Sequence, residues 1–197
     1  MGKRMAKIKK LVFGVGINDS GYPLSKIIEG RQVTCRPYQL WQSMLRRCYS
    51  ESFQSKWPTY KGCSVCEEWL IFSSFAKWME KQDWKGKHLD KDILKVGNKI
   101  YSPDNCIFVS PEINLLLNNS RASRGKYKQG VCLNKGKFQA KISKNGKIIS
   151  LGRFQMESDA SNAYKKAKSE HIINIATQQS EPLRSALIRH AEEYAKT

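Results

Sequence analysis

Hydrophobic and polar positions alternate along short segments between residues 127 and 154, which is the period of β-strands. In the clearest segment, Phe138, Ala140 and Ile142 point one way, so the polar residues between them point the other way. Asn145-Gly146 follows and indicates a type I′ hairpin turn, because both of its positions tolerate positive φ. The pattern predicts a β-hairpin with one apolar face and one basic face.

The strand after this turn is expected over residues 147–154, with Ile149 and Leu151 inward and Ser150 outward. Helical spacing then replaces the alternation, and one helical stripe consists of Ala160, Ala163, Tyr164 and Ala167. With one earlier short strand, these segments predict a three-stranded antiparallel sheet whose apolar face packs on a helix, over residues 127–176.

Two amphipathic helices are expected in the N-terminal half, over residues 37–49 and roughly 65–81. Pro37 suits the first turn of the first helix. Before them, residues 11–17 (LVFGVGI) indicate a strand followed by a turn. The expected core stripes are Tyr38, Trp41, Met44 or Leu45 and Cys48 in the first helix, and Trp69, Phe72, Phe75, Ala76 and Met79 in the second.

The segment from residue 88 to residue 117 indicates a strand, a turn, a second strand or loop, and a short helix. The turn is expected at Gly97-Asn98-Lys99, and Ser110-Pro111 suits the start of the helix. This order is the ββα arrangement.

A last amphipathic helix is expected after Ser180-Glu181-Pro182, in the range 177–197. Its apolar face consists of Leu183, Leu187, His190 and Tyr194. Two alternatives stay open: the face packs on the sheet domain, or it pairs with a second copy of the chain in a homodimer. His171 is expected in the linker before this helix.

Charge separates the chain from most soluble proteins of its length, since 35 Lys and Arg stand against 17 Asp and Glu, a formal net charge of +18. Residues 113–156 contain no acidic residue, which favours a polyanion such as nucleic acid as the partner. The sequence offers neither a signal peptide nor an apolar run that could span a membrane, so we expect a cytoplasmic protein with no membrane partner. Its six scattered cysteines indicate reduced thiols.

The sheet segment resembles the DNA-binding domain of plant ethylene-response factors, which also occurs in phage homing endonucleases. The resemblance rests on Gly130-Val131, Gly136-Lys137-Phe138, Ala140-Lys141-Ile142, Leu151-Gly152-Arg153-Phe154 and Ala160-Ser161-Asn162-Ala163-Tyr164. It implies double-stranded DNA as the partner, with the sheet in the major groove. The implied or outward-facing contact candidates are Lys128, Gln129, Lys135, Lys137, Gln139, Lys141, Ser143, Ser150, Arg153 and Tyr164.

The middle of the chain, about residues 38–118, is similar to phage HNH-type endonucleases. The similarity rests on Arg47-Cys48-Tyr49, Gly62, Val65-Cys66-Glu67-Glu68-Trp69, Leu89-Asp90-Lys91, Tyr101-Ser102-Pro103-Asp104-Asn105-Cys106 and Glu112-Ile113-Asn114. It implies one divalent metal, Mg²⁺ or another, held by a hairpin and a helix beside the scissile phosphate.

The implied catalytic candidates are Asp90, Lys91 and Asn105, and the implied metal ligands are Asp90, Asp92 and Asn114. Asp90-Lys91-Asp92 stands where the family has Asp-His, so a neutral-pH base is missing unless His88 serves in a shifted register. The alternatives are a working nuclease, a binding-only derivative, and a structural role in which Asp90 and Asn105 satisfy turn backbone.

Cysteine spacing adds a separate hypothesis, because Cys63 and Cys66 have the separation of a zinc knuckle. Cys48 and Cys106 could complete four sulfur ligands for Zn²⁺. The competing interpretation is that these cysteines are buried core thiols.

These patterns predict an α+β protein. The expected parts are a basic arm and strand (1–36), an HNH-like ββα module with helices (37–118), a basic linker (119–126), the sheet and helix domain (127–176) and a terminal helix (177–197). The expected function is sequence-specific binding of duplex DNA by a derivative of a homing endonuclease, as a site-specific binder or transcriptional repressor. An active metal-dependent nuclease and an RNA-binding accessory protein are the alternatives.

Overall fold

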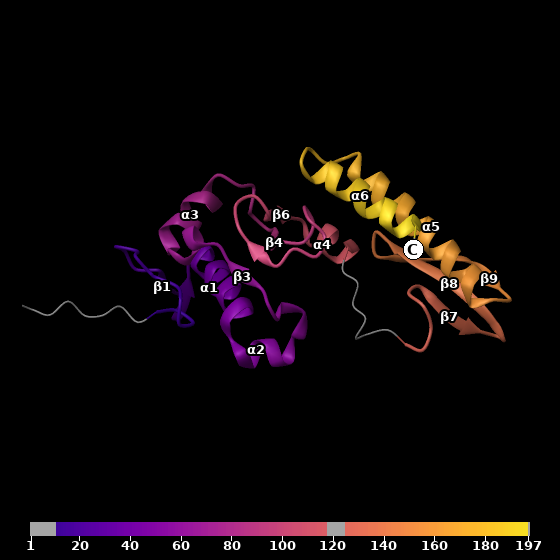
Figure 1. The fold of residues 1–197 in the computed structure, drawn as a ribbon, viewed down its shortest axis with the longest axis horizontal. Coiled ribbons are helices and arrows are strands. Elements are labelled where there is room, and N and C mark those ends of the chain that lie inside the picture. The colour runs from indigo at the N-terminus through magenta and orange to yellow at the C-terminus, as the bar shows by residue number, and fades with distance from the viewer. Residues whose placement is uncertain (1–10, 118–124, 197) are drawn as a thin grey trace, which may run out of the picture. The chain divides into compact units, whose positions relative to one another are not determined.

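The computed structural model describes residues 11–117 and 125–196, so the expected basic arm and most of the linker at 119–126 lie outside the described residues. The fold is α+β (Figure 1). By packing, the chain forms two compact units, Met1–Pro111 and Glu112–Thr197, called here the N-terminal and the C-terminal unit. No helix in the described ranges is long and apolar enough to cross a membrane.

The N-terminal unit combines helices with three small two-stranded sheets, β1–β2, β3–β5 and β4–β6. Its elements are β1 (Ser25–Ile28), β2 (Arg31–Thr34), α1 (Arg36–Tyr49), α2 (Glu51–Lys56), the 3₁₀ turn η1 (Pro58–Tyr60), β3 (Ser64–Val65), η2 (Glu67–Leu70), α3 (Phe72–Glu80), β4 (His88–Asp90), β5 (Ile100–Tyr101) and β6 (Ile107–Val109).

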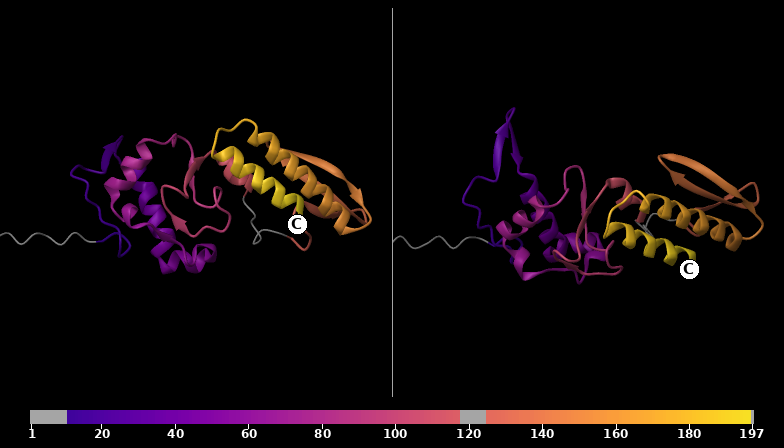
Figure 2. Two further views of the ribbon diagram at one scale, coloured as in Figure 1. Left: turned by 45° about the horizontal axis from the view of Figure 1, so that its top comes forward. Right: turned by 90° about the horizontal axis from the view of Figure 1, so that it is seen from above.

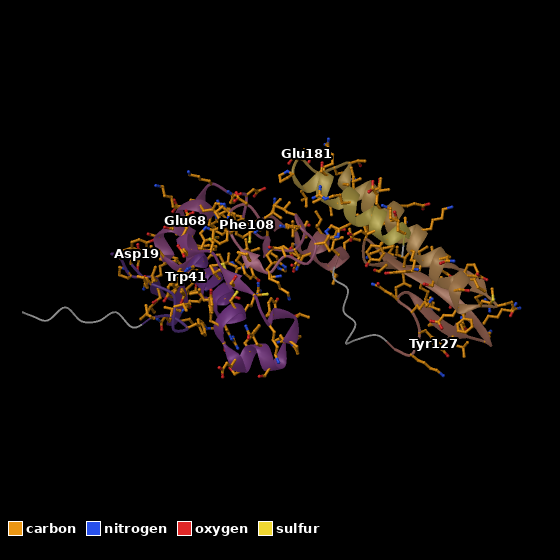
Figure 3. The ribbon with its side chains drawn as sticks, in the orientation of Figure 1. Asp19, Trp41, Glu68, Phe108, Tyr127 and Glu181 are labelled. Atoms are coloured by element: carbon orange, nitrogen blue, oxygen red, sulfur yellow. The ribbon has the colours of Figure 1, made fainter. Side chains whose placement is uncertain are left out.

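Helix α1 confirms the expected first helix, and its apolar stripe enters the core of the N-terminal unit. Trp41 is fully buried, and its indole Nε1 donates a hydrogen bond to the carbonyl oxygen of Trp69 at 2.7 Å. Figure 3 labels Trp41 and Phe108, which both belong to this core. An aromatic core therefore holds this unit together.

The helix expected over residues 65–81 is divided into β3, η2 and α3. Ile71 is extended, because its neighbours bond to Ile17: the Ile17 amide donates to Leu70, and the Phe72 amide donates to Ile17. The pairing stops the helix, yet all five expected core residues of the segment are buried. The apolar pattern was right and the continuous helix was wrong.

Residues 11–17 do not form the expected strand. The segment folds back on itself, and Val12 pairs with Gly16. A Cβ on Gly16 would lie 2.4 Å from Cδ1 of Leu45, so glycine is needed where this turn touches α1. The β1–β2 hairpin, which was not expected, extends away from the helices of its unit (Figure 2).

The C-terminal unit holds the expected antiparallel sheet in the order β7–β8–β9. Its elements are α4 (Pro111–Leu117, all but its first residue), β7 (Val131–Asn134), β8 (Lys137–Lys144), β9 (Lys147–Phe154), α5 (Glu157–Ala176) and α6 (Leu183–Lys196). The turn at Asn145-Gly146 has φ of 51° and 73°, which confirms the expected hairpin type. A second turn of this kind, not expected, lies at Lys135-Gly136, with φ of 50° and 74°.

The apolar face of the sheet packs on α5, and α6 packs on α5 in turn (Figure 1). Ile142, Tyr164 and Ala167 form the centre of the first contact. Buried residues of α6, namely Leu183, Ala186, Leu187 and Ala191, cover the far side of α5. The first alternative for the terminal helix is therefore realised, and a dimer through α6 would need another face of that helix.

Helix α5 is longer than its apolar stripe predicts and continues to Ala176. His171 lies inside this helix and is buried, so the expectation of a linker position was wrong. The buried alanines of α5 and α6 allow two long helices to lie close together, which the short stripe could not reveal.

Candidate nucleic-acid interface

One face of the β7–β8–β9 sheet points away from α5 and carries most of the DNA-contact candidates. The strand register places Lys141 opposite Ser150 and Gln139 opposite Arg153. Because paired residues share a face, their side chains project together from the side opposite buried Ala140 and Ile142. This surface, called the outer face, consists of Lys137, Gln139, Lys141, Ser143, Ile148, Ser150 and Arg153.

A β-bulge decides which residues of β9 belong to the outer face. The register shifts between Ala140 and Lys141, so that β9 contains one extra residue, Leu151, between the partners Ser150 and Gly152. Simple alternation from Ser150 would direct Arg153 inward. With the bulge, Arg153 pairs with Gln139 and joins the outer face. Gly152 has φ of 124°, a conformation that glycine permits and other residues rarely adopt.

Amide and hydroxyl groups form a chain of hydrogen bonds across the outer face. Asn134 Nδ2 donates to Gln139 Oε1 at 2.7 Å, and Gln139 Nε2 donates to Ser150 Oγ at 2.9 Å. These bonds join all three strands and orient the central amide of Gln139. Asn134 was not among the sequence candidates, and the Lys135-Gly136 turn that places it opposite Lys137 was the available signal.

The loop before β7 is fixed to both the sheet and α5. The Lys128 amide donates to Glu157 Oε1 at 2.7 Å, and the Lys141 amide donates to the Gly130 carbonyl at 2.8 Å. Tyr127 packs edge-on against Phe138, with ring centroids 5.6 Å apart. Lys128 is exposed and Gln129 is half-buried, so these two candidates lie at the rim of the sheet, and Lys135 lies in the β7–β8 turn.

Tyr164 was expected near the DNA backbone, and the structure contradicts this. Its side chain is only 7% exposed and packs between Ile142 and Ala167 under the sheet. Gly130 lies directly against its ring, since a Cβ there would be 2.0 Å from Cδ2 of Tyr164. An aromatic residue on the apolar stripe of α5 thus supports the sheet from beneath.

Charge differs between the two layers of the C-terminal unit. Residues 127–156 contain no acidic residue, whereas α5 and α6 mix acidic residues (Glu157, Asp159, Glu170, Glu192 and Glu193) with basic ones (Lys165, Lys166, Lys168, Arg184, Arg189 and Lys196). The basic residues of the sheet layer are Lys128, Lys135, Lys137, Lys141, Lys144, Lys147 and Arg153. The positive potential is consequently concentrated on the sheet side.

Three of the catalytic and metal candidates, Asp90, Lys91 and Asp92, lie in the Asp90 loop, residues 90–99, which begins at the last residue of β4. Asp90 Oδ1 accepts hydrogen bonds from the amides of Asp92 at 2.7 Å and Ile93 at 2.8 Å. This arrangement is an Asx turn, in which the carboxylate replaces a backbone acceptor. The alternative that Asp90 satisfies turn backbone is therefore confirmed.

Lys91 is buried within the same loop, so it does not meet the solvent as a phosphate contact would. It is 5% exposed, and its Nζ donates to Asp92 Oδ1 at 2.6 Å and to the Asn98 carbonyl at 2.9 Å. Asn98 Nδ2 donates back to the Lys91 carbonyl at 2.8 Å and to that of Ile100 at 2.7 Å. The loop is closed by this network.

These contacts leave a donor set that does not fit a divalent cation. One oxygen of each carboxylate is engaged, and the Lys91 ammonium beside Asp92 opposes a second positive charge. Arg47 is a further cationic neighbour of Asp90, and its pKa lies above the ordinary value. Burial lowers this pKa, but the side chains of Tyr101, Tyr60 and Asp90 together raise it by more.

The remaining nuclease candidates are spread over several elements. His88 is exposed on β4 and shares the side of Asp90, two residues away. Asn105 is half-buried in a turn where its amide and that of Cys106 donate to the Ser102 carbonyl. Asn114 lies on α4.

The four candidate zinc cysteines do not gather into a ligand set. Across residues 11–117 and 125–196, no three His, Cys, Asp or Glu side chains group as a metal site would require. Cys48, Cys63 and Cys106 are buried, and Cys66 is half-buried. Burial raises the pKa of Cys48 and of Cys106 to about 12, which keeps both as neutral thiols.

Comparison with known proteins gave no match to a protein-family model, to a curated protein or to a solved structure.

Proposed function

We propose that the protein binds double-stranded DNA through the outer face, as a site-specific binder of the repressor kind. The observation that carries the proposal is the outer face itself: an exposed sheet surface with three cationic side chains and no carboxylate, on a chain of net charge +18. Such a surface complements a row of phosphates.

Cationic and amide side chains on the outer face support recognition of base sequence as well as binding to phosphates. Lys137, Lys141 and Arg153 can neutralise phosphates or bond to guanine, and the amide of Gln139 has the donor and acceptor pair that suits adenine. The fixed orientation of Gln139 between Asn134 and Ser150 lowers the entropy lost on binding. Direct contacts from a rigid sheet are a means of distinguishing sequences.

The test is a titration of labelled duplex DNA by fluorescence anisotropy at several salt concentrations. We expect Lys141→Ala and Arg153→Ala each to weaken binding about tenfold, with the salt slope reduced by about 0.9 for a lost phosphate contact. Lys166→Ala on α5 and Lys77→Ala on α3 are controls, because both remove an exposed lysine outside the sheet. A DNA affinity that does not change with salt concentration, or an equal loss of DNA affinity in all four variants, would refute the proposal.

DNA cleavage is the second candidate function, favoured by the order of β4, β6 and α4, which follows the ββα arrangement of the resemblance. The engaged Asp90 and buried Lys91 argue for binding without cleavage. Incubation of supercoiled and target-selected DNA with Mg²⁺ or Mn²⁺ decides between them: nicks that disappear in Asn105→Ala would establish a nuclease. Preference for structured or single-stranded RNA over duplex DNA would instead support the accessory RNA-binding role.

A further inference from the structure

A cavity of about 160 Å³ lies within the C-terminal unit, between α5, the β8–β9 turn and α4. Lys168 and His171 line it from α5, Ser143 and Gly146 line it from the hairpin, and Glu112 lines it from α4. This space is roughly ten times the minimum of about 10–15 Å³ that one water needs.

Two basic side chains are buried at this cavity without the partners that burial normally demands. Lys168 and His171 are each 8% exposed. Within residues 11–117 and 125–196, Lys168 makes no hydrogen bond and no ion pair. The Nζ atom of Lys168 is not fully buried and keeps contact with solvent. Most of the side chain is nevertheless withdrawn from water and has no counter-charge, which an anion in the cavity would supply.

The electrostatic surroundings of the cavity are positive. Burial lowers the pKa of Lys168. Burial, followed by Lys144 and Lys168, lowers the pKa of His171, and Glu112 opposes this only weakly, as the last of the contributions. The charged or titratable residues that line the cavity are Lys168, His171 and Glu112, and Glu112 is an exposed residue. The remaining lining includes the apolar Leu115, Leu116 and Ile175.

We infer that this cavity is a binding site for a phosphate-type oxyanion, with Lys168 supplying the charge and His171 supplying a hydrogen-bond donor. The anion is either free phosphate or a backbone phosphate of nucleic acid. The site does not depend on the proposed DNA binding by the outer face, because its cationic groups lie on the opposite, helix side of the hairpin tip.

Replacing Glu112 changes anion affinity in a direction that tells an anion site from a cavity in which Glu112 itself is the counter-charge. If the cavity holds an anion, the carboxylate repels it, and Glu112→Gln tightens anion binding. If Glu112 is instead the counter-charge that compensates Lys168 and His171, the same change leaves the cavity more unbalanced without creating an anion site.

The experiment is a titration of the full-length protein with inorganic phosphate at constant ionic strength, followed by NMR at the Gly146 amide and the His171 imidazole. We expect saturable shifts in the natural protein, weaker binding by at least about tenfold in Lys168→Met, and tighter binding in Glu112→Gln. Lys166→Met, on the same helix but exposed, is the matched control and should titrate like the natural protein. His171→Gln provides a second variant if Lys168→Met does not fold.

Absence of saturable shifts at Gly146, equal titrations in Lys168→Met and Lys166→Met, or weaker binding in Glu112→Gln would each overturn the inference. Titration of duplex DNA with the same variants identifies the source of the anion. A loss of DNA affinity in Lys168→Met, with a salt slope smaller by about 0.9, indicates a backbone phosphate. Unchanged DNA affinity together with lost phosphate binding indicates free phosphate.

Discussion

The outer face of the sheet and the Asp90 loop contain similar residues, lysines beside amides and hydroxyl or carboxyl groups, but they use them in opposite ways. On the outer face, Lys137 and Arg153 are exposed, and none of the residues that make up this face is acidic. In the Asp90 loop, Lys91 is buried, and its ammonium is shared by Asp92 and the Asn98 carbonyl. The same residue types serve structure in one place and remain available to a partner in the other.

This difference gives a criterion for separating binding residues from structural ones. A polar side chain whose hydrogen-bonding groups are all satisfied inside the protein gains little from a ligand, because an existing bond must be broken first. By this criterion the exposed Lys137 and Arg153 of the outer face are better candidates for contact with a partner than the buried, hydrogen-bonded Lys91 of the Asp90 loop.

The largest expected effect tests whether the outer face can be separated from the packing beneath it. Gly130→Ala places a methyl group 2.0 Å from the Tyr164 ring at a φ of 76°, and should reduce the free energy of unfolding of the C-terminal unit by about 3 kcal/mol. Gly136→Ala is the control, with φ of 74° and no neighbour within 4 Å, and should cost about 1 kcal/mol. Circular dichroism is the measurement, since all five tryptophans lie in the N-terminal unit. Equal losses would show that the contact with Tyr164 is unimportant.

The next effect tests the structural role of the Asp90 loop. Lys91→Met removes the donor to Asp92 and Asn98 and should lower the free energy of unfolding of the N-terminal unit by about 2 kcal/mol. Lys95→Met, at an exposed position of the same loop, should stay within about 0.5 kcal/mol of the natural protein. Denaturant unfolding followed by tryptophan fluorescence measures both. If the Lys91→Met variant were as stable as the natural protein but bound DNA much more weakly, Lys91 would be a binding residue and not a structural one.

A smaller effect on stability is expected at His171, a buried residue that lies neither on the outer face nor in the Asp90 loop. Burial, then Lys144 and Lys168, lowers its pKa below the ordinary value of 6.5, while Glu112 partly opposes them. The unfolded chain therefore binds more protons than the folded chain just below that pH. The stabilisation that neutral His171 gives to the folded state is fully present above pH 6.5, and it is lost as the pH falls through the folded-state pKa of His171.

We therefore expect the melting temperature of the C-terminal unit to fall on acidification from about pH 7.5 to about pH 5 in phosphate-free buffer, and to fall less in His171→Gln. His190→Gln is the control, because it removes a histidine on α6 that does not line the cavity. If acidification affects the natural protein and His171→Gln equally, another group is responsible.

The smallest effect on stability is expected at Gln139, and it sharpens the comparison most directly. Gln139→Ala removes two hydrogen bonds from a solvent-accessible surface and should change the free energy of unfolding by no more than about 0.5 kcal/mol. If the amide reads a base, discrimination between selected and altered sites should fall by roughly 1 kcal/mol. Thermal melts and competition binding measure the two quantities. Unchanged discrimination would limit Gln139 to a structural role.

Local signals explain why the C-terminal sheet could be predicted. Phe138, Ala140 and Ile142 alternate strictly, and Asn145-Gly146 is a strong turn signal, so sequence neighbours were sufficient. The break at Ile71 could not be predicted in this way. It depends on pairing with Ile17, which is 54 residues earlier in the chain.

The candidate site residues also differ in whether near or distant parts of the chain determine their surroundings. Strand alternation was enough to place Lys137, Gln139 and Lys141 on one face. Burial of Lys91 depends on Asn98, seven residues away, and burial of Tyr164 depends on a close approach of Gly130. Side chains whose environment is created by distant backbone cannot be assigned a role from spacing.

The bulge at Leu151 has a geometric consequence for any helical partner. A bulge bends its strand and increases the local right-handed twist, so the two rows of side chains on the outer face diverge along a curve rather than run parallel across a plane. A flat sheet can touch a groove at one point, whereas a curved sheet can follow the groove as it winds around the duplex. One extra residue in β9 therefore has two effects: it turns Arg153 onto the outer face, and it curves the surface that a groove would meet.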